Sequence, residues 1–217
     1  MTKPVARAPQ RSNARSNRAR ILETARRELG RNPDMTLEEL AQASGVVRRT
    51  IFGHFPGRMA LLEALADEAS ETLNARLEAG APHFANEPPA RALAYFVVSG
   101  WSVGDRYRFL LALARRDLGA ARVAEIIAPT RAQLAAILGR GQHDGVFQAH
   151  LPATLLATGI EAMTLGLLEE FGATGLPVDV RGVALTTLIA AGVPEAQARS
   201  TFEDVVATLP VPQVDAD

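Results

Sequence analysis

An all-α fold is what this sequence predicts, from its composition and from the spacing of its apolar residues. Of the 217 residues, 47% are hydrophobic but only 5% are aromatic, and Ala and Leu dominate the apolar share, which favours packed helices over strands. Apolar residues also recur at three- and four-residue intervals, the period of an amphipathic helix. We therefore expect a small three-helix domain followed by a larger helical domain.

Charge divides the chain in the same way. Residues 1–60 hold 12 Lys and Arg against 5 Asp and Glu, whereas residues 61–217 hold 11 basic and 19 acidic side chains. A basic segment next to an acidic one suggests that the N-terminal part meets a polyanion. Residues 1–22 carry six basic and no acidic groups, so we expect a basic arm over 1–17 that is mobile alone and contacts nucleic-acid grooves or phosphates.

Several classes of protein are excluded or disfavoured. The chain has no cysteine, which excludes disulfide scaffolds, Cys-based zinc sites and thiol nucleophiles. No apolar stretch follows the basic N-terminus, as a secretory signal would require. The longest apolar stretch, Leu151–Leu168, contains Glu161 and is shorter than the roughly 20 residues of a membrane span. We expect a cytoplasmic protein without membrane contact.

The first predicted domain covers residues 18–60. Its first helix begins near Arg18, shows apolar residues at helical spacing from Ile21 to Leu29, and ends at Gly30. The second helix, Leu37–Ser44, begins with a capping box in which Thr36 and Glu39 satisfy each other's amides. Gly45 ends it, and a third short helix follows over 47–52.

The tight turn between these short helices is typical of a helix-turn-helix. One face of the pair is apolar, formed by Leu37, Leu40, Ala41, Val46, Ile51 and Phe55. The opposite side carries Arg48, Arg49, Thr50 and His54. Arginine on an exposed helix pairs well with guanine O6 and N7 in the major groove, while threonine and histidine reach phosphates.

This segment resembles the DNA-binding domain of the tetracycline-repressor (TetR) family of regulators. The resemblance covers residues 18–65 and rests on the residues Thr36, Ala43, Gly45-Val46, Thr50-Ile51-Phe52, His54-Phe55 and Arg58. Val47 and Phe52 replace the usual serine and tyrosine, so one helix cap and one phosphate donor are lost. The resemblance implies DNA contacts by Thr36, Val47, Arg48, Arg49, Thr50, Phe52, His54 and Arg58.

The same resemblance implies a homodimer that places two recognition helices in successive major grooves, about 34 Å apart. A small-molecule effector bound in the larger domain changes that separation, and the fourth helix, Arg58–Leu77, transmits the change. Such a protein is most often a repressor of a palindromic double-stranded operator.

The larger domain, residues 61–217, is predicted from its helical pattern and its Gly and Pro breaks. Pro129 is expected to kink or split one helix. The expected helices are Arg58–Leu77, Pro89–Trp101, Asp105–Leu118, Arg122–Leu138, Pro152–Phe171, Val180–Ala191 and Pro194–Ala207.

Two candidate sites lie in this domain. Aromatic and polar side chains suggest a pocket for an apolar or aromatic effector, with Trp101, Tyr95, Phe96, Arg106, Tyr107, Phe109 and Met163 as its predicted contacts. A stripe of small residues, Thr158, Gly159, Ala162 and Gly166, suggests a close dimer interface. For both groups plain internal packing is the alternative. His143, Asp144 and His150 lack a second ligand cluster, so neither metal nor cofactor is expected.

An enzyme is disfavoured because the sequence has no phosphate loop, no HExxH, no GxSxG and no paired carboxylates at a telling helical position. The alternative that stays open is a helix-turn-helix fold used as a protein-interaction module, which regulates another regulator without specific DNA binding.

Overall fold

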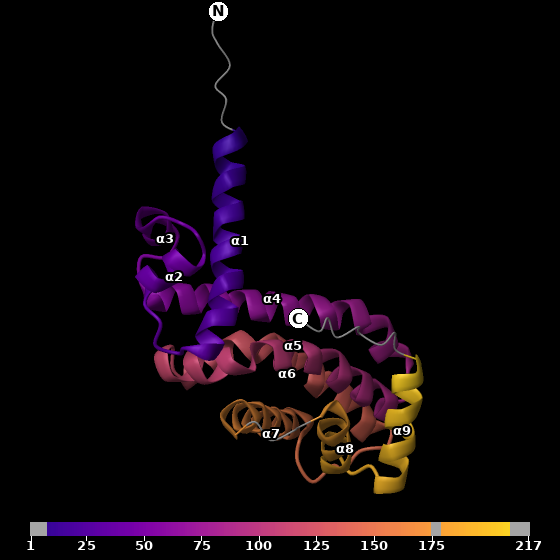
Figure 1. Ribbon diagram of the computed structural model, residues 1–217. Helices are drawn as coiled ribbons and strands as arrows, with labels where there is room; N and C mark the ends of the chain where they lie inside the picture. Colours follow the sequence, from indigo (N-terminus) through magenta and orange to yellow (C-terminus); the bar gives the residue numbers. More distant parts are fainter. Residues whose placement is uncertain (1–7, 175–178, 209–217) are drawn as a thin grey trace, which may run out of the picture. The chain divides into compact units, whose positions relative to one another are not determined.

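The computed structural model describes residues 8–174 and 179–208, and all regular structure in these residues is helical (Figure 1). The all-α prediction is confirmed. The helices are α1 (Ala8–Arg31), α2 (Leu37–Ala43), α3 (Arg48–His54), α4 (Arg58–Asn86), α5 (Pro89–Asp117), α6 (Ala120–His143), α7 (Ala153–Thr174), α8 (Val180–Ala190) and α9 (Glu195–Thr208). No helix among the described residues is long and apolar enough to cross a membrane.

The chain forms two compact units that are not contiguous in sequence. The first contains the residues up to Ala69 together with Phe109–Val123, and the second contains Ser70–Arg108 and the residues from Ala124 on. The sequence predicted a boundary at residue 60. The difference arises because α4, α5 and α6 each contribute residues to both units.

In the first unit, α1 begins ten residues earlier than its apolar pattern predicted. Residues 8–17 are helical rather than a mobile arm; residues 1–7 of the predicted arm lie outside the described residues. Arg, Ala and Gln are good helix formers, and extending an existing helix fixes one residue for each new hydrogen bond. The apolar period from Ile21 onward therefore marks where α1 packs, not where it begins.

In the second unit, two predicted helix breaks are absent. The segment over 102–104 was expected to interrupt α5, yet the helix runs on to Asp117 because Val103 and Tyr107 are buried on its inner face. Pro129 does not split α6. Side chains bond carbonyls just before the proline: Ser70 Oγ donates to Ile126 O (3.1 Å), and Arg131 donates to Ala124 O (3.2 Å).

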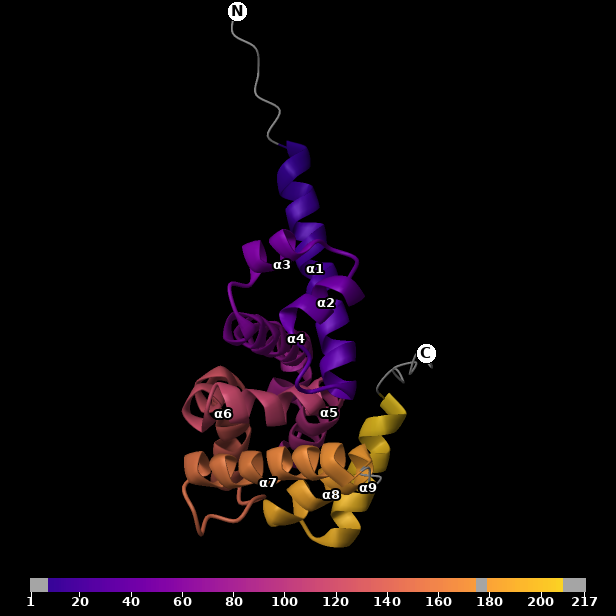
Figure 2. The same cartoon turned by 60° about the vertical axis from the view of Figure 1, so that its left-hand side comes forward.

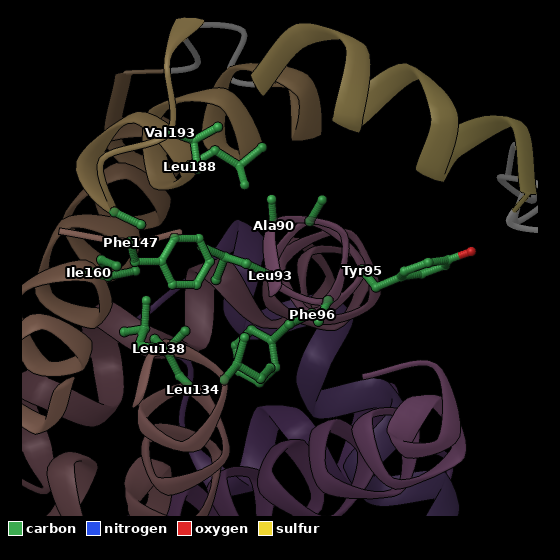
Figure 3. Packing of buried hydrophobic residues seen from close by; sticks show 14 of the residues in the cluster. Ala90, Leu93, Tyr95, Phe96, Leu134, Leu138, Phe147, Ile160, Leu188 and Val193 are labelled. Carbon is green, nitrogen blue, oxygen red and sulfur yellow. The ribbon is translucent and has the colours of Figure 1, made fainter. Parts of the chain in front are cut away.

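The core of the second unit is an apolar cluster contributed mainly by α5, α6, α7 and α8 (Figure 3). Leu93, Leu138 and Leu188 are fully buried in it. The ring of Phe147, in the α6–α7 connection, lies directly on the backbone of Gly141; a Cβ there would stand 2.1 Å from the ring. This contact requires glycine at position 141.

Candidate nucleic-acid interface

The beginning of α2 is fixed by the predicted capping box. The hydroxyl of Thr36 accepts from the Glu39 amide at 3.2 Å, and the Thr36 amide donates to the Glu39 carboxylate at 2.8 Å. The hydrogen bond from the Thr36 backbone, followed by that from its side chain, lowers the pKa of Glu39. Two amides that the helix leaves unpaired are thereby satisfied.

The turn between α2 and α3 depends on Gly45, whose φ of 65° lies in the left-handed region. The amide of Val46 donates to Ala41 O at 3.0 Å and closes the turn. Val47 is the N-cap of α3 and, as predicted, makes no side-chain capping bond. The apolar face packs inward: Leu37, Leu40, Ala41, Ile51 and Phe55 are buried, and Val46 is half-buried.

The other face of α3 is polar and accessible. Arg48 and Arg49 are exposed, whereas Thr50 and His54 are half-buried. The Arg48 guanidinium is 2.9 Å from the Glu38 carboxylate and lies over the Phe52 ring, 5.3 Å from its centroid. The helix therefore presents cationic donors on the side opposite its core, as the spacing predicted.

An open groove of about 420 Å³ lies between the beginnings of α2 and α4 and the side of α3. It brings together Thr36, Phe52 and Arg58, which come from three different helices or caps and were each predicted to contact DNA. Glu38 and Asp34 also line the groove, so its electrostatic character is mixed.

Arg58 has a second role that sequence reasoning missed. Its guanidinium donates to Pro33 O (2.6 Å), to Met35 O (3.2 Å) and to Asp117 Oδ2 (3.0 Å). Arg58 thus joins the beginning of α4 to the α1–α2 connection and to the end of α5. No local signal in the sequence predicts this, because Asp117 is 59 residues away.

Asp117 is the centre of this network. Arg116 donates to its other oxygen at 2.7 Å and reaches Asp34 at 3.2 Å. The hydrogen bond from Arg116, with a further one from Arg58, holds the pKa of Asp117 below its ordinary value, although burial opposes the shift. Nearby, Arg122 forms a two-bond pair with Glu63 of α4, with contacts of 3.0 and 2.9 Å.

The predicted effector residues do not all lie together. Phe109 belongs to the first unit, where a Cβ on Gly30 of α1 would stand 3.3 Å from its ring. Tyr95 points to the opposite side of α5 from Leu93 (Figure 3), and its hydroxyl is 2.6 Å from the hydroxyl of Thr208. The others lie in the second unit: Phe96 and Tyr107 are buried, Trp101 and Met163 are half-buried, and Arg106 is exposed.

The predicted interface residues share one exposed stripe of α7. Thr158, Gly159, Ala162 and Gly166 are exposed, and a Cβ on either glycine would meet open space. Leu155 on the same stripe is 57% exposed, and Ile189 on α8 is 46% exposed. Figure 2 shows α7 and α8 side by side. Both helices therefore expose apolar side chains within the part of the chain that the structure describes.

Comparison with known proteins agrees with this geometry. Residues 21–65 match the model of the bacterial regulatory proteins of the tetR family. The match spans α2, the turn and α3, and ends within α4. No curated protein matches the sequence.

Solved structures extend the likeness to most of the chain. The fatty acid degradation regulator FadR from Bacillus halodurans has a TM-score of 0.67 at 16% identity, over 81% of this chain and 95% of its own. FadR from Bacillus subtilis in complex with stearoyl-CoA has a TM-score of 0.63 at 18% identity, over 88% and 99%.

A third similar structure is the TetR-like regulator LfrR from Mycobacterium smegmatis in complex with proflavine, with a TM-score of 0.56 at 21% identity over 89% of this chain and 96% of its own. At these identities the likeness concerns the fold. Residues 21–65 form an N-terminal domain of the tetR family of bacterial regulatory proteins, and the chain that carries it has the fold of these regulators.

Proposed function

We propose that this protein is a dimeric transcription regulator that binds a palindromic operator and responds to a small molecule, acting as a repressor that its effector releases. The observation that carries the proposal is the polar face of α3. Arg48 and Arg49 stand exposed opposite a fully packed core face, on a helix held by a capped partner. A short cationic helix of this kind fits the major groove.

Each residue of this surface has an assigned part. Arg48 and Arg49 read base edges, because guanidinium groups pair with guanine O6 and N7. Val47, 69% exposed at the beginning of α3, suits a thymine methyl group. Thr50, His54 and Arg58 donate to phosphates. Thr36, whose amide and hydroxyl both donate to Glu39, and Phe52, which lacks a hydroxyl, contribute only van der Waals contact.

A second copy of the chain is the partner proposed for the α7–α8 surface. Gly159 and Gly166 allow close approach of a helix, and Leu155 and Ile189 supply apolar area. Replacement of Gly159 by Leu would block that approach and shift the protein to monomer in sedimentation. The exposed Arg199→Ala variant, on α9 outside this surface, is the control that stays dimeric.

The effector is proposed to bind the second unit. Related folds have been solved with resorcinol, stearoyl-CoA and proflavine, all of which offer apolar or aromatic surface. Phe96, Trp101, Tyr107 and Met163 supply matching side chains from α5 and α7. Because α4, α5 and α6 contribute to both units, a shift of these helices in the second unit reaches the DNA-binding surface.

The test is selection of bound sequences from a random duplex library, by the wild type and by the Arg48→Ala, Arg49→Ala double variant. An enriched palindrome that the variant loses supports the proposal. The matched control is the Arg76→Ala, Arg199→Ala variant, which removes two exposed arginines of the second unit outside α7 and α8 and keeps the palindrome. If the wild type enriches nothing yet still dimerises, the interaction-module alternative replaces the proposal.

The assigned roles are separable. Arg49→Ala should relax selection at one base position and cost about 1–3 kcal/mol of binding. Arg58→Ala should weaken all sequences alike, and it should also lower the melting temperature because three internal hydrogen bonds are lost. If both variants weaken every sequence equally, the division between base and phosphate contacts is wrong.

A further inference from the structure

One face of α1 is apolar and buried in its C-terminal part and carries arginines in its N-terminal part. Leu22, Ala25 and Leu29 are buried and recur at the spacing of one helix face. Counting back along that face, the next positions are Arg18 and Arg15. These two arginines, called here the basic row, therefore stand on the same side of α1 as the core of the helix-turn-helix.

A direct contact places the row next to the recognition helix. The guanidinium of Arg18 lies over the ring of Phe55, 5.7 Å from its centroid. Phe55 is the C-cap of α3. The row thus begins at the end of α3 and extends from there along α1, which projects past α2 and α3 (Figures 1 and 2).

The charge of this extension is uncompensated. From Ala8 to Leu22 the sequence holds four arginines and no acidic residue, and Glu23, the first acidic side chain, is engaged with Arg26. Arg15 and Arg18 are exposed, and neither has a carboxylate partner within the part of the chain that the structure describes. Guanidinium groups fixed on a helix face lose less freedom on binding an anion than those of a mobile arm.

We propose that the basic row is a second DNA-contacting element, which binds the phosphate backbone beside the groove that α3 occupies. This inference rests on the proposed function and adds sequence-independent binding of the DNA backbone to it. Phosphates are the chosen partner because the row begins at the end of α3 and extends along α1 past it, where exposed guanidinium groups meet phosphate oxygens beside the groove.

The experiment compares two variants that each remove two arginines from α1. Arg15→Ala with Arg18→Ala deletes the row. Arg20→Ala with Arg27→Ala is the matched control, because these side chains face away from the row and have local partners in Asn17 and Glu28. Binding to the operator duplex that the wild type selects is measured by fluorescence anisotropy over a series of salt concentrations.

Loss of the row should make the slope of log K against log salt shallower by about 0.9 for each lost phosphate contact, hence by nearly two per protomer. Affinity should fall at least tenfold at low salt while the selected palindrome stays the same. The control should keep the wild-type slope. Equal slopes for row variant, control and wild type would overturn the inference, and a changed palindrome would assign the row to base reading instead.

Because Arg18 contacts Phe55, the double variant is also checked by thermal unfolding. Arg15→Ala, which removes no internal contact, carries the test if the double variant unfolds, with half the change in slope. The two proposals fail separately. The wild type could select no palindrome yet bind duplexes in a salt-sensitive way that the Arg15→Ala, Arg18→Ala variant loses. That result would refute the proposed operator but support the phosphate contacts of the basic row.

Discussion

The two units differ in how their helices are held. In the first unit, arginines at the ends of helices bond particular acceptors: Arg58 binds two carbonyls and Asp117, and Arg122 binds Glu63. In the second unit a large apolar cluster joins the helices, and directional bonds such as the Arg131–Glu161 pair (2.7 Å) and the contact between the Tyr95 and Thr208 hydroxyls (2.6 Å) lie beside it.

The difference matters because the two kinds of contact constrain motion differently. A hydrogen bond is lost over a few tenths of an ångström or an unfavourable angle, so the bonds of Arg58 restrict how α4 can move relative to the α1–α2 connection. Apolar contact is non-directional and tolerates sliding and repacking. Under the proposed function, contact with a regular duplex in the first unit and binding of a small molecule in the second would use these respective properties.

The largest loss of stability is expected from a substitution at Gly141, where the apolar cluster leaves no room for a side chain. Gly141→Ala would place a Cβ 2.1 Å from the ring of Phe147, so the ring would have to move out of its packed position. Overpacking of this kind costs about 1–3 kcal/mol. Urea unfolding would measure the loss.

Gly139→Ala is the control for that change. It lies on the same helix, and its Cβ would stand 3.7 Å from the Cβ of Ala153, an ordinary contact. The better helix propensity of alanine should then stabilise the protein by about 0.5–1 kcal/mol. If both variants unfold alike, close packing at Gly141 is not what distinguishes this region.

A smaller loss is expected from Asp117→Asn, which breaks the directional network of the first unit. Hydrogen bonds to a charged partner contribute about 1.5–3 kcal/mol, and partial exposure of Arg58 brings the expected loss to the lower end. Asp34→Asn is the control, because Asp34 touches the same Arg116 but is 82% exposed and should change stability by less than about 0.5 kcal/mol.

The Asp117 effect should also depend on pH. Its pKa in the folded protein is lowered, so its contribution is fully present above the unfolded value of about 3.9 and is lost as the pH falls through the lower, folded-state pKa. Wild type and Asp117→Asn should therefore differ at neutral pH and converge as acid protonates Asp117. A difference that persists unchanged into strong acid would contradict this account.

The smallest effect is expected at the beginning of α2. Thr36→Ala removes the hydroxyl that accepts from the Glu39 amide and should cost about 1 kcal/mol, whereas Thr36→Ser keeps the acceptor and should cost little. Thermal unfolding measures both. If alanine and serine behave alike, the capping box does not stabilise the first unit.

Local patterns allowed α2, the turn and α3 to be predicted nearly to the residue. The capping pair is three residues apart, Gly45 marks the turn, and the apolar period identifies the packed face, so each signal lies within a short window. The exposure of Arg48 and Arg49 followed from the same period.

Features that depend on distant residues were not predicted. The bond of Arg58 to Asp117 joins residues far apart in sequence. The same holds for the packing of Phe109 by Gly30 and for the contact between Tyr95 and Thr208. The segment over 102–104 and Pro129 were expected to interrupt helices, yet burial and side-chain bonds to nearby carbonyls keep both helices continuous. Tertiary contacts overrode propensity at these positions.

The placement of Phe109–Val123 in the first unit has a consequence for how such proteins change over evolution. A gene fusion that joined residues 1–69 to an unrelated sensing domain would leave Arg58, Glu63 and Gly30 without Asp117, Arg122 and Phe109. Under the proposed function, a fusion at residue 69 would therefore transfer the DNA-contacting surface without the contacts that Phe109–Val123 supply. An exchange that carried the α5–α6 corner along with residues 1–69 would keep these contacts.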